Sequence, residues 1–175
     1  STKGPKLNSE QKKAILDVKK SHTFNTFLLD GVTGSGKTEI YLSIISDVIE
    51  RGQDALILVP EIGLINQLNR RIEVRLGIKP SQYHSGLTEN ERFITWKKIQ
   101  ESKTRIILGT RSAILAPFKN LGLIVVDEEH DISYKQQEGF RYSARDLAVM
   151  RAKNFNIPII LGSATPSLES FKQHV

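Results

Sequence analysis

The chain contains no cysteine and no long run of apolar residues. Among its 175 residues there are only four His, and these lie far apart in the sequence. Disulfides and thiolate metal sites are therefore excluded, and a zinc site would need clustered histidines and carboxylates. Neither a stretch of 18 apolar residues nor an apolar segment behind a basic start occurs. We accordingly expect no membrane span and no targeting signal, and predict a cytoplasmic protein.

The composition is moderately basic. Lys and Arg number 25 and Asp and Glu 19, which gives a formal net charge of +6 and an isoelectric point near 9.5. A polyanionic partner such as nucleic acid is compatible with this excess, although the acidic residues dilute it and no long basic tract occurs. The length suits one well-buried domain. We predict a single domain over residues 7–175, after a disordered or vector-derived lead-in at residues 1–6.

Short apolar segments alternate with amphipathic ones along the chain. Several are continuous Leu, Ile and Val, a pattern typical of strands buried on both faces. The expected strands are Phe27–Asp30, Ala55–Pro60, Ser81–His84, Arg105–Gly109, Leu123–Asp127 and Ile159–Gly162. The expected helices are Ser9–Lys20, Lys37–Arg51, Leu64–Leu76, Glu89–Glu101 and Ala144–Lys153, with a last helix from near Ser167. This order predicts an α/β fold with a doubly wound, mainly parallel sheet and helices on both faces.

The stretch GVTGSGKT lies between a predicted strand and a predicted helix. It fits the pattern G-x-x-x-x-G-K-[ST] at every fixed position. Its glycines let successive backbone N–H groups turn around an anion, and the helix behind them adds its positive end. Lys37 is expected to reach the β- and γ-phosphates of a nucleoside triphosphate, and the Thr38 hydroxyl to bind Mg²⁺. The predicted nucleotide-binding residues here are Gly31, Val32, Thr33, Gly34, Ser35, Gly36, Lys37 and Thr38.

The stretch LIVVDEEH places acidic residues directly after a buried strand. A carboxylate at the tip of such a strand can meet the metal that Thr38 touches, so we predict that Asp127 binds Mg²⁺ through water. Glu128 is then expected to polarise the attacking water as a general base. The predicted catalytic residues are Lys37, Asp127 and Glu128. For Glu129 and His130, local hydrogen bonding at the junction remains an alternative to a functional role.

The order of these motifs resembles a known motor architecture. A phosphate loop, then Asp-Glu-Glu-His, then GSAT at Gly162–Thr165 is similar to the first motor lobe of a superfamily 2 helicase. More narrowly, the chain resembles the PriA family of primosomal replication-restart helicases in the segments LLDGVTGSGKTEIYL, LVPEIGLINQ, YHSGL, GTRSAILAPFKNLGLIVVDEEH, SYKQQEGFRYSARDLAVMRA and LGSATPSLES. The resemblance implies a RecA-like P-loop NTPase domain that uses ATP and Mg²⁺ in the bacterial cytoplasm.

The resemblance also implies roles for residues beyond the nucleotide site. Two segments match lobe-one motifs that line single-stranded DNA, and their hydroxyls, amides and single Arg suit contacts to phosphates. The implied residues are Pro60, Glu61, Thr110, Arg111 and Ser112. Ordinary turn chemistry remains the alternative for Thr110 and Ser112. The residues implied to couple the nucleotide site to DNA are His130, Ser163 and Thr165.

An aromatic segment follows the acidic residues. It interleaves aromatic rings with cations, which suits stacking on bases while the cations meet phosphates. The residues concerned are Tyr134, Lys135, Phe140, Arg141 and Tyr142. The segment resembles the aromatic-rich loop of the family, and we hypothesise that it senses DNA and repositions the catalytic acids. Packing of the rings against the domain is the alternative. Ser143 stands where the family pattern has histidine, which leaves its role open.

Gln11 has two possible roles. Asn8 can cap a helix, and Gln11 follows three residues later, which is the spacing of a reciprocal capping box. Gln11 also matches the adenine-reading glutamine that precedes the phosphate loop in the family. Both roles use the same side-chain amide, and of the two we favour adenine recognition.

Other conspicuous side chains are predicted to be structural. Phe93, Trp96 and Ile99 fall on one face of a predicted helix, so core packing is expected for them and likewise for Phe155. His84 begins the family-like HSGL, and both an unpaired surface histidine and a functional one are open.

The leading hypothesis is an ATP-hydrolysing motor lobe of a helicase that unwinds forked DNA during replication restart. A nucleotide-dependent nucleic-acid-binding module without unwinding activity is one alternative, and a small-molecule kinase is another. The family implies single-stranded and forked DNA, a second helicase lobe, other primosome proteins and single-stranded-DNA-binding protein as partners, and no membrane. Because the second lobe supplies an arginine finger, we expect this chain to be a fragment with weak nucleotide affinity and little turnover.

Overall fold

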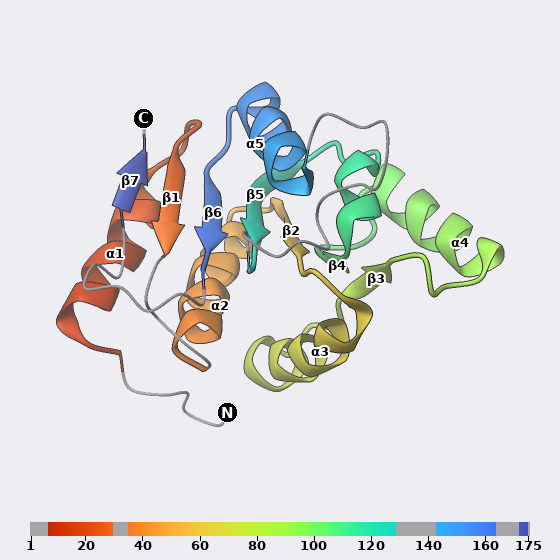
Figure 1. Cartoon of the computed structure of the whole chain (residues 1–175), viewed down its shortest axis with the longest axis horizontal. Coiled ribbons are helices and arrows are strands. Elements are labelled where there is room, and N and C mark those ends of the chain that lie inside the picture. Colours follow the sequence, from red (N-terminus) through yellow and green to blue (C-terminus); the bar gives the residue numbers. More distant parts are fainter. Residues whose placement is uncertain (1–6, 30–34, 129–142, 164–171, 175) are drawn as a thin grey trace.

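The computed structural model describes residues 7–29, 35–128, 143–163 and 172–174 of the chain. Its centre is a seven-stranded sheet in the order β3-β4-β2-β5-β6-β1-β7 (Figure 1). The strands are β1 (Thr26–Leu29), β2 (Asp54–Leu58), β3 (Ser81–Tyr83), β4 (Ile106–Gly109), β5 (Leu121–Val126), β6 (Ile159–Gly162) and β7 (Lys172–His174). All neighbours from β3 to β1 are parallel, and β7 pairs antiparallel with β1. The predicted doubly wound, mainly parallel α/β sheet is confirmed.

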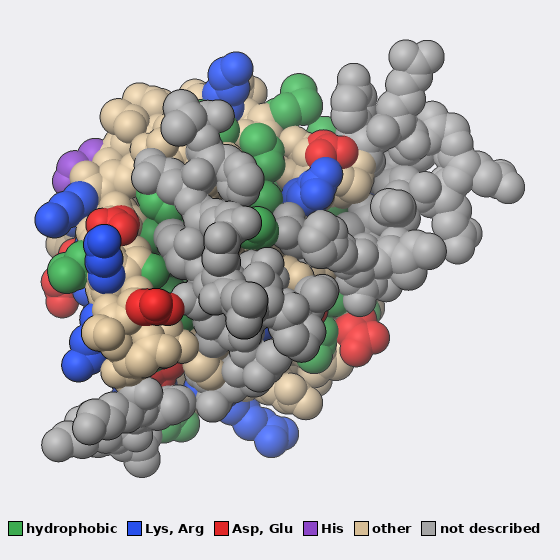
Figure 2. Space-filling model, turned by 60° about the vertical axis from the view of Figure 1, so that its left-hand side comes forward, with side chains coloured by type: hydrophobic (Ala, Val, Ile, Leu, Met, Phe, Trp, Pro, Cys, Tyr) green, Lys and Arg blue, Asp and Glu red, His purple; other side chains and the backbone are tan. Residues whose placement is uncertain are grey.

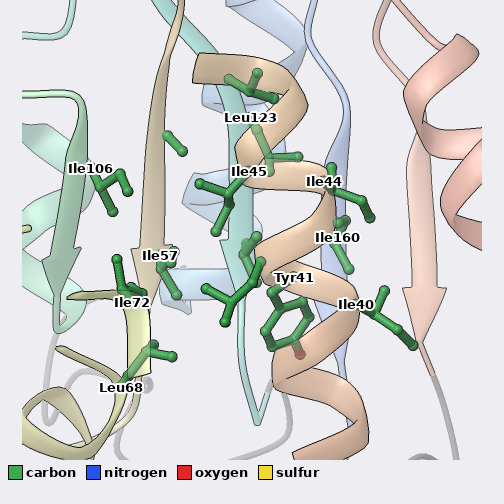
Figure 3. Close-up of a cluster of buried hydrophobic side chains, with 14 of the residues drawn as sticks. Ile40, Tyr41, Ile44, Ile45, Ile57, Leu68, Ile72, Ile106, Leu123 and Ile160 are labelled. Atoms are coloured by element: carbon green, nitrogen blue, oxygen red, sulfur yellow. The ribbon is translucent and has the colours of Figure 1, made fainter. Parts of the chain in front are cut away.

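Helices cover both faces of this sheet. They are α1 (Ser9–Lys20), α2 (Ser35–Glu50), α3 (Ile62–Leu76), α4 (Glu89–Gln100) and α5 (Ala144–Phe155), with a 3-10 helix η1 (Arg111–Leu115). In β2, Ala55 and Ile57 belong to the core under α1, α2 and α3, whereas Leu56 and Leu58 belong to the core under α4, η1 and α5. Figure 3 shows the first of these cores, where α2 and α3 face the strands. In the described part of the chain no helix is long and apolar enough to cross a membrane.

Burial on both faces explains why the strands read as continuous apolar runs. Every residue of β2, β4, β5 and β6 is buried. A fully buried Leu, Ile or Val contributes about 1.5–3 kcal/mol relative to the exposed state, so this sheet is the main stabilising element. Three helices, α1, α4 and α5, begin where a polar side chain caps them. The amide of Gln11 bonds to Asn8 Oδ1 at 2.8 Å, Glu91 pairs in the same way with Thr88, and Ser143 Oγ accepts from the amide of Asp146 at 3.2 Å. Ser143 thus starts α5.

The expected elements agree with the structure to within about two residues, with two exceptions. The sequence pattern predicts neither η1 nor β7. The last helix, predicted to begin near Ser167, lies outside the described residues, and Lys172–His174 beyond it form a strand. A three-residue polar strand has no hydrophobic period to detect, and its backbone pairs with the edge of β1.

The expectation for α4 is correct only in part. Ile99 is buried and Trp96 packs on the second core, with its ring 5.7 Å from that of Tyr83. Phe93, however, is 63% exposed, so its predicted core role is wrong. The helix packs on β3 at the edge of the sheet, where only part of its circumference meets other elements (Figure 1). Phe155 packs on the second core as expected.

Asp54 gives a prediction about stability. It is 3% exposed at the start of β2, and burial raises its pKa to about 6, while Arg105 at 3.5 Å lowers it. The folded state therefore prefers the protonated acid. Its stabilising contribution is complete below about pH 4 and is lost as pH rises through 6. We expect the free energy of unfolding of Asp54→Asn, relative to that of the wild type, to rise by about 1–3 kcal/mol between pH 4 and pH 7.

The measurement is urea unfolding of both proteins across that range. Since all other acids are common to both, the difference in unfolding free energy isolates Asp54. A difference that does not change with pH would contradict the assignment.

Candidate functional site

The first turn of α2 carries the described part of the phosphate loop. Gly31–Gly34 lie outside the described residues, and Ser35 and Gly36 open the helix. Lys37 and Thr38 follow in its first turn. The ammonium of Lys37 is 2.9 Å from Asp127 Oδ1 and 2.7 Å from Glu128 Oε1, and the Lys37 side chain is only 5% exposed. The structure therefore brings together the three residues predicted to be catalytic.

The charge of Lys37 is stabilised by these two acids. Burial lowers the pKa of Lys37, but the nearby charge of Asp127 and the hydrogen bonds to Glu128 and Asp127 outweigh burial, and the pKa is raised above its ordinary value. The lysine is consequently fully protonated at neutral pH. Both carboxylates are partly exposed, at 20% and 32%, and face the same cavity.

A turn after β5 presents the two acids. The amide of Asp127 donates to the carbonyl of Leu58 at 2.9 Å, so the last pairing with β2 fixes its backbone. Glu128 has φ of 54°, in the left-handed region. A non-glycine residue there costs about 1–2 kcal/mol, so the turn is held against local preference. Glu128 nevertheless returns its side chain to Lys37.

A cavity of about 270 Å³ opens beside these residues. Its described lining consists of Lys37, Thr38, Tyr41, Val59, Leu64, Gln67, Leu68, Arg71, Asp127 and Glu128. Tyr41 and the polar residues of α3, Gln67 and Arg71, were missed by the sequence reasoning. The spacing of Gln67 and Arg71 places them on one helix face, but no sequence pattern says that this face borders a cavity.

The donor set of the cavity fits a metal-bound polyphosphate. One ammonium, one hydroxyl and two carboxylates are the groups that hold phosphates and Mg²⁺ in this class of site. Within residues 7–29, 35–128, 143–163 and 172–174, no three His, Asp or Glu cluster as a self-sufficient metal site. A metal here would thus share its ligands with phosphate oxygens. Thr38 and Asp127 would hold it.

Gln11 lies in the capping box of α1. The side-chain Oε1 of Gln11 accepts a hydrogen bond from the backbone N–H of Asn8 at 3.0 Å. The backbone N–H of Gln11 donates to the side-chain Oδ1 of Asn8. The capping role is therefore present in the structure. Gln11 is not part of the described lining of the cavity, and adenine recognition stays a prediction.

A second cavity, of about 330 Å³, gathers five of the residues predicted to contact DNA. It is lined by Pro60, Glu61, Ile62, Ser85, Thr110, Arg111 and Ser112, which follow the carboxyl ends of β2, β3 and β4. Gly109 makes this possible, because a Cβ there would lie 2.2 Å from the Cβ of Ala113 and 2.8 Å from the Tyr83 carbonyl oxygen. η1 can fold closely against β4 only without that side chain. Ile62 and Ser85 are additional lining residues.

His84 is not a surface histidine. It is 5% exposed, and its Nδ1 accepts a hydrogen bond from the amide of Gly86 at 3.1 Å. Burial lowers the pKa of His84, and a coulombic effect of Glu91 partly opposes this. Of the two alternatives left open for His84, the unpaired surface histidine is therefore wrong. The ring holds the turn that presents Ser85 to the second cavity.

Ser163 lies at the end of β6. It is buried, and its amide donates to the carbonyl of Leu29 at 2.9 Å. The remaining residues with predicted roles lie outside the described residues; these are His130, Tyr134, Lys135, Phe140, Arg141, Tyr142 and Thr165.

Comparison with known proteins gives a consistent family. The model of the family described as DEAD/DEAH box helicase matches residues 8–174. Replication restart proteins PriA are 49% identical in Haemophilus influenzae, 48% in Bacillus subtilis and 50% in Synechocystis, over 94%, 94% and 97% of this chain. The chain spans 22%, 21% and 21% of those relatives' lengths.

A solved structure shares the fold. It is the structure of RecG bound to a three-way DNA junction, with a TM-score of 0.70 and 25% sequence identity. The match covers 93% of this chain and 21% of that one. The RecA-like prediction for the fold is confirmed by this likeness.

The shared ammonium yields a second prediction. We expect Lys37→Ala to destabilise the nucleotide-free protein by about 1–3 kcal/mol at pH 8, because two facing carboxylates lose their cation. The value lies below that of a fully buried pair, since both acids reach solvent. Unfolding in urea at pH 8 measures it.

Lys103→Ala is the matched control. Lys103 is 2.8 Å from Glu101, but this lysine is 69% exposed, and exposed pairs contribute little. We expect no measurable change. Equal losses for the two variants would show that the buried pair has no special role.

Proposed function

The chain belongs to the DEAD/DEAH box helicase family, and we propose that it is the ATP-binding motor lobe of a helicase that unwinds forked DNA during replication restart. Its relatives named PriA are four to five times longer than the matched region. The lobe therefore acts together with a second lobe, and the primosome proteins and single-stranded-DNA-binding protein are its partners in the cell. DNA unwinding belongs to that longer protein.

One observation carries the chemical part of the proposal. Residues from α2 and from the end of β5, 90 positions apart, converge on one cavity through Lys37 and Asp127. In the proposed site Lys37 binds the β- and γ-phosphates of ATP, and Thr38 and Asp127 hold Mg²⁺. When bound, the metal neutralises charge that develops on the phosphates. Glu128 orients and deprotonates the attacking water.

Nucleotide binding changes the partners of Lys37. In the described state the ammonium is bound by both carboxylates, so it must turn from them toward the phosphates. That exchange releases Glu128 to act on water. The cavity, at about 270 Å³, is smaller than most complete ligand pockets of about 300–1,000 Å³. This supports a cleft that the second lobe completes.

The DNA path in the proposal runs over the second cavity. Thr110, Arg111 and Ser112 offer hydroxyls and one guanidinium to phosphates, the contacts that position a strand without reading its sequence. Charge alone does not locate this path: on the face in Figure 2, Lys and Arg side chains lie among Asp and Glu side chains. The similar RecG structure is bound to a three-way DNA junction, which supports DNA as the substrate.

ATP hydrolysis with and without single-stranded DNA tests the proposed function. We expect DNA to stimulate hydrolysis by the protein that carries both lobes, and the 175-residue chain alone to turn over slowly, because an arginine finger is worth about 10³–10⁵ in rate. Glu128→Gln is expected to lower the rate at least roughly 100-fold while ATP binding persists.

The same measurement separates the alternatives. A nucleotide-dependent binding module would bind ATP and DNA, but Glu128→Gln would leave its properties unchanged. A kinase would respond to a small phosphate acceptor rather than to DNA. Rapid hydrolysis by this chain alone would contradict the need for a second lobe.

Arg111 is predicted to bind a DNA phosphate. We expect Arg111→Ala to weaken single-stranded DNA binding to a similar extent for all sequences, and to reduce the slope of log affinity against log salt by about 0.7. Fluorescence anisotropy at several salt concentrations measures both. Lys13→Ala is the control and should change neither quantity, because Lys13 is exposed on α1 and is not part of the described lining of the second cavity. A sequence-dependent loss in Arg111→Ala would indicate base reading instead.

A further inference from the structure

Tyr41 connects the phosphate-loop helix to the acids of β5. It lies one turn after Lys37 on α2 and is 1% exposed. Its hydroxyl donates to Asp127 Oδ1 at 2.8 Å, the same oxygen that Lys37 approaches at 2.9 Å. Figure 3 shows the Tyr41 ring projecting from α2 toward the sheet, with its hydroxyl near the carboxyl ends of the strands.

The end of β6 is shaped around this hydroxyl. A Cβ at Gly162 would lie 1.8 Å from the Tyr41 hydroxyl oxygen and 3.1 Å from Asp127 Oδ1. Only glycine therefore leaves room for the bond between Tyr41 and Asp127. Tyr41 belongs to α2, Asp127 follows β5 and Gly162 ends β6, so these three elements meet at one hydroxyl group. Ser163 follows Gly162 directly. We call the contact of Tyr41, Asp127 and Gly162 the hydroxyl joint.

We propose that Tyr41 is a positioning residue that holds the carboxylate of Asp127 in its metal-binding orientation and transmits movement of the β6 end to it. This inference rests on the proposed function. When Lys37 turns toward phosphates, Asp127 loses one donor, whereas the bond from buried Tyr41 needs no rearrangement. Gly162 lies against the Tyr41 hydroxyl oxygen, and that hydroxyl is bonded to Asp127. A displacement of the backbone at Ser163 and Gly162 would therefore move the hydroxyl and, through it, the carboxylate of Asp127.

A purely structural role for Tyr41 makes a different prediction. Buried tyrosine hydroxyls usually have a hydrogen-bond partner, and losing that partner affects stability alone. A positioning role must in addition change how the site responds to metal. The decisive quantity is therefore the Mg²⁺ concentration that half-saturates nucleotide binding, measured separately from hydrolysis.

The first test is Tyr41→Phe in the two-lobe protein. We expect the Mg²⁺ concentration for half-maximal binding of a fluorescent ATP analogue to rise roughly ten- to a hundredfold, the effect of one lost hydrogen bond to a charged group. Nucleotide affinity in EDTA should stay unchanged. Tyr83→Phe, which removes a hydroxyl from a tyrosine at the end of β3, is the control and should leave both quantities unchanged. An unaltered Mg²⁺ requirement in Tyr41→Phe would overturn the proposal.

The second test uses the close contact itself. Gly162→Ala should lower the thermal midpoint and raise the Mg²⁺ requirement, because its methyl group displaces the hydroxyl. Adding Tyr41→Phe removes the oxygen at 1.8 Å and leaves the ring carbon at 3.1 Å as the nearest Tyr41 atom. The double variant should therefore be more stable than the sum of the single effects predicts. Strict additivity, or an unchanged Mg²⁺ requirement in Gly162→Ala, would refute the link to β6.

These outcomes are separable from failure of the proposed function. If the wild-type protein does not bind ATP, the proposed function is wrong, and the non-additive thermal midpoints still report on the hydroxyl joint. If ATP binding is normal and the midpoints add, the joint alone is refuted.

Discussion

The ion pair between Lys37 and the acids Asp127 and Glu128 is the interaction on which the site depends. It joins the helix after β1 to the loop after β5, although β6 lies between these strands in the sheet. Parallel strands make this contact possible, because all their carboxyl ends reach the same edge. The sheet, covered by helices on both faces, fixes the positions of those ends, and the ion pair links α2 to the residues that follow β5.

Much of the fold could be predicted because it is encoded locally. Continuous apolar runs such as those of β2 and β5 are typical of strands buried on both faces of a sheet. Asn8 caps the start of α1. Phe93, His84 and β7 could not be predicted in the same way. Whether Phe93 is covered depends on where α4 meets the edge of the sheet, and the bond of His84 to Gly86 depends on a turn. These are tertiary facts without a local signature.

The candidate site, like the fold, has a part that could be predicted from the sequence and a part that could not. The phosphate loop and the acidic pair are contiguous motifs, and their residue types and spacing predict their chemistry. The second cavity joins segments that follow three different strands, so Ser85 could be assigned to it only once β3 and β4 were adjacent. Tyr41 looks like an ordinary core residue in the sequence. Its polar role becomes visible only when Asp127 and Gly162 are placed around its oxygen.

The charged residues that line the first cavity determine how strongly it attracts anions from a distance. Two cationic side chains, Lys37 and Arg71, and two anionic ones, Asp127 and Glu128, are the charged groups in its described lining. The described lining is therefore formally electroneutral and exerts little long-range attraction on a polyanion. In the proposed function, a nucleic-acid backbone near this cavity would therefore not be attracted into the nucleotide site by long-range charge. The cleft selects its occupant at short range, where geometry and counter-charge decide.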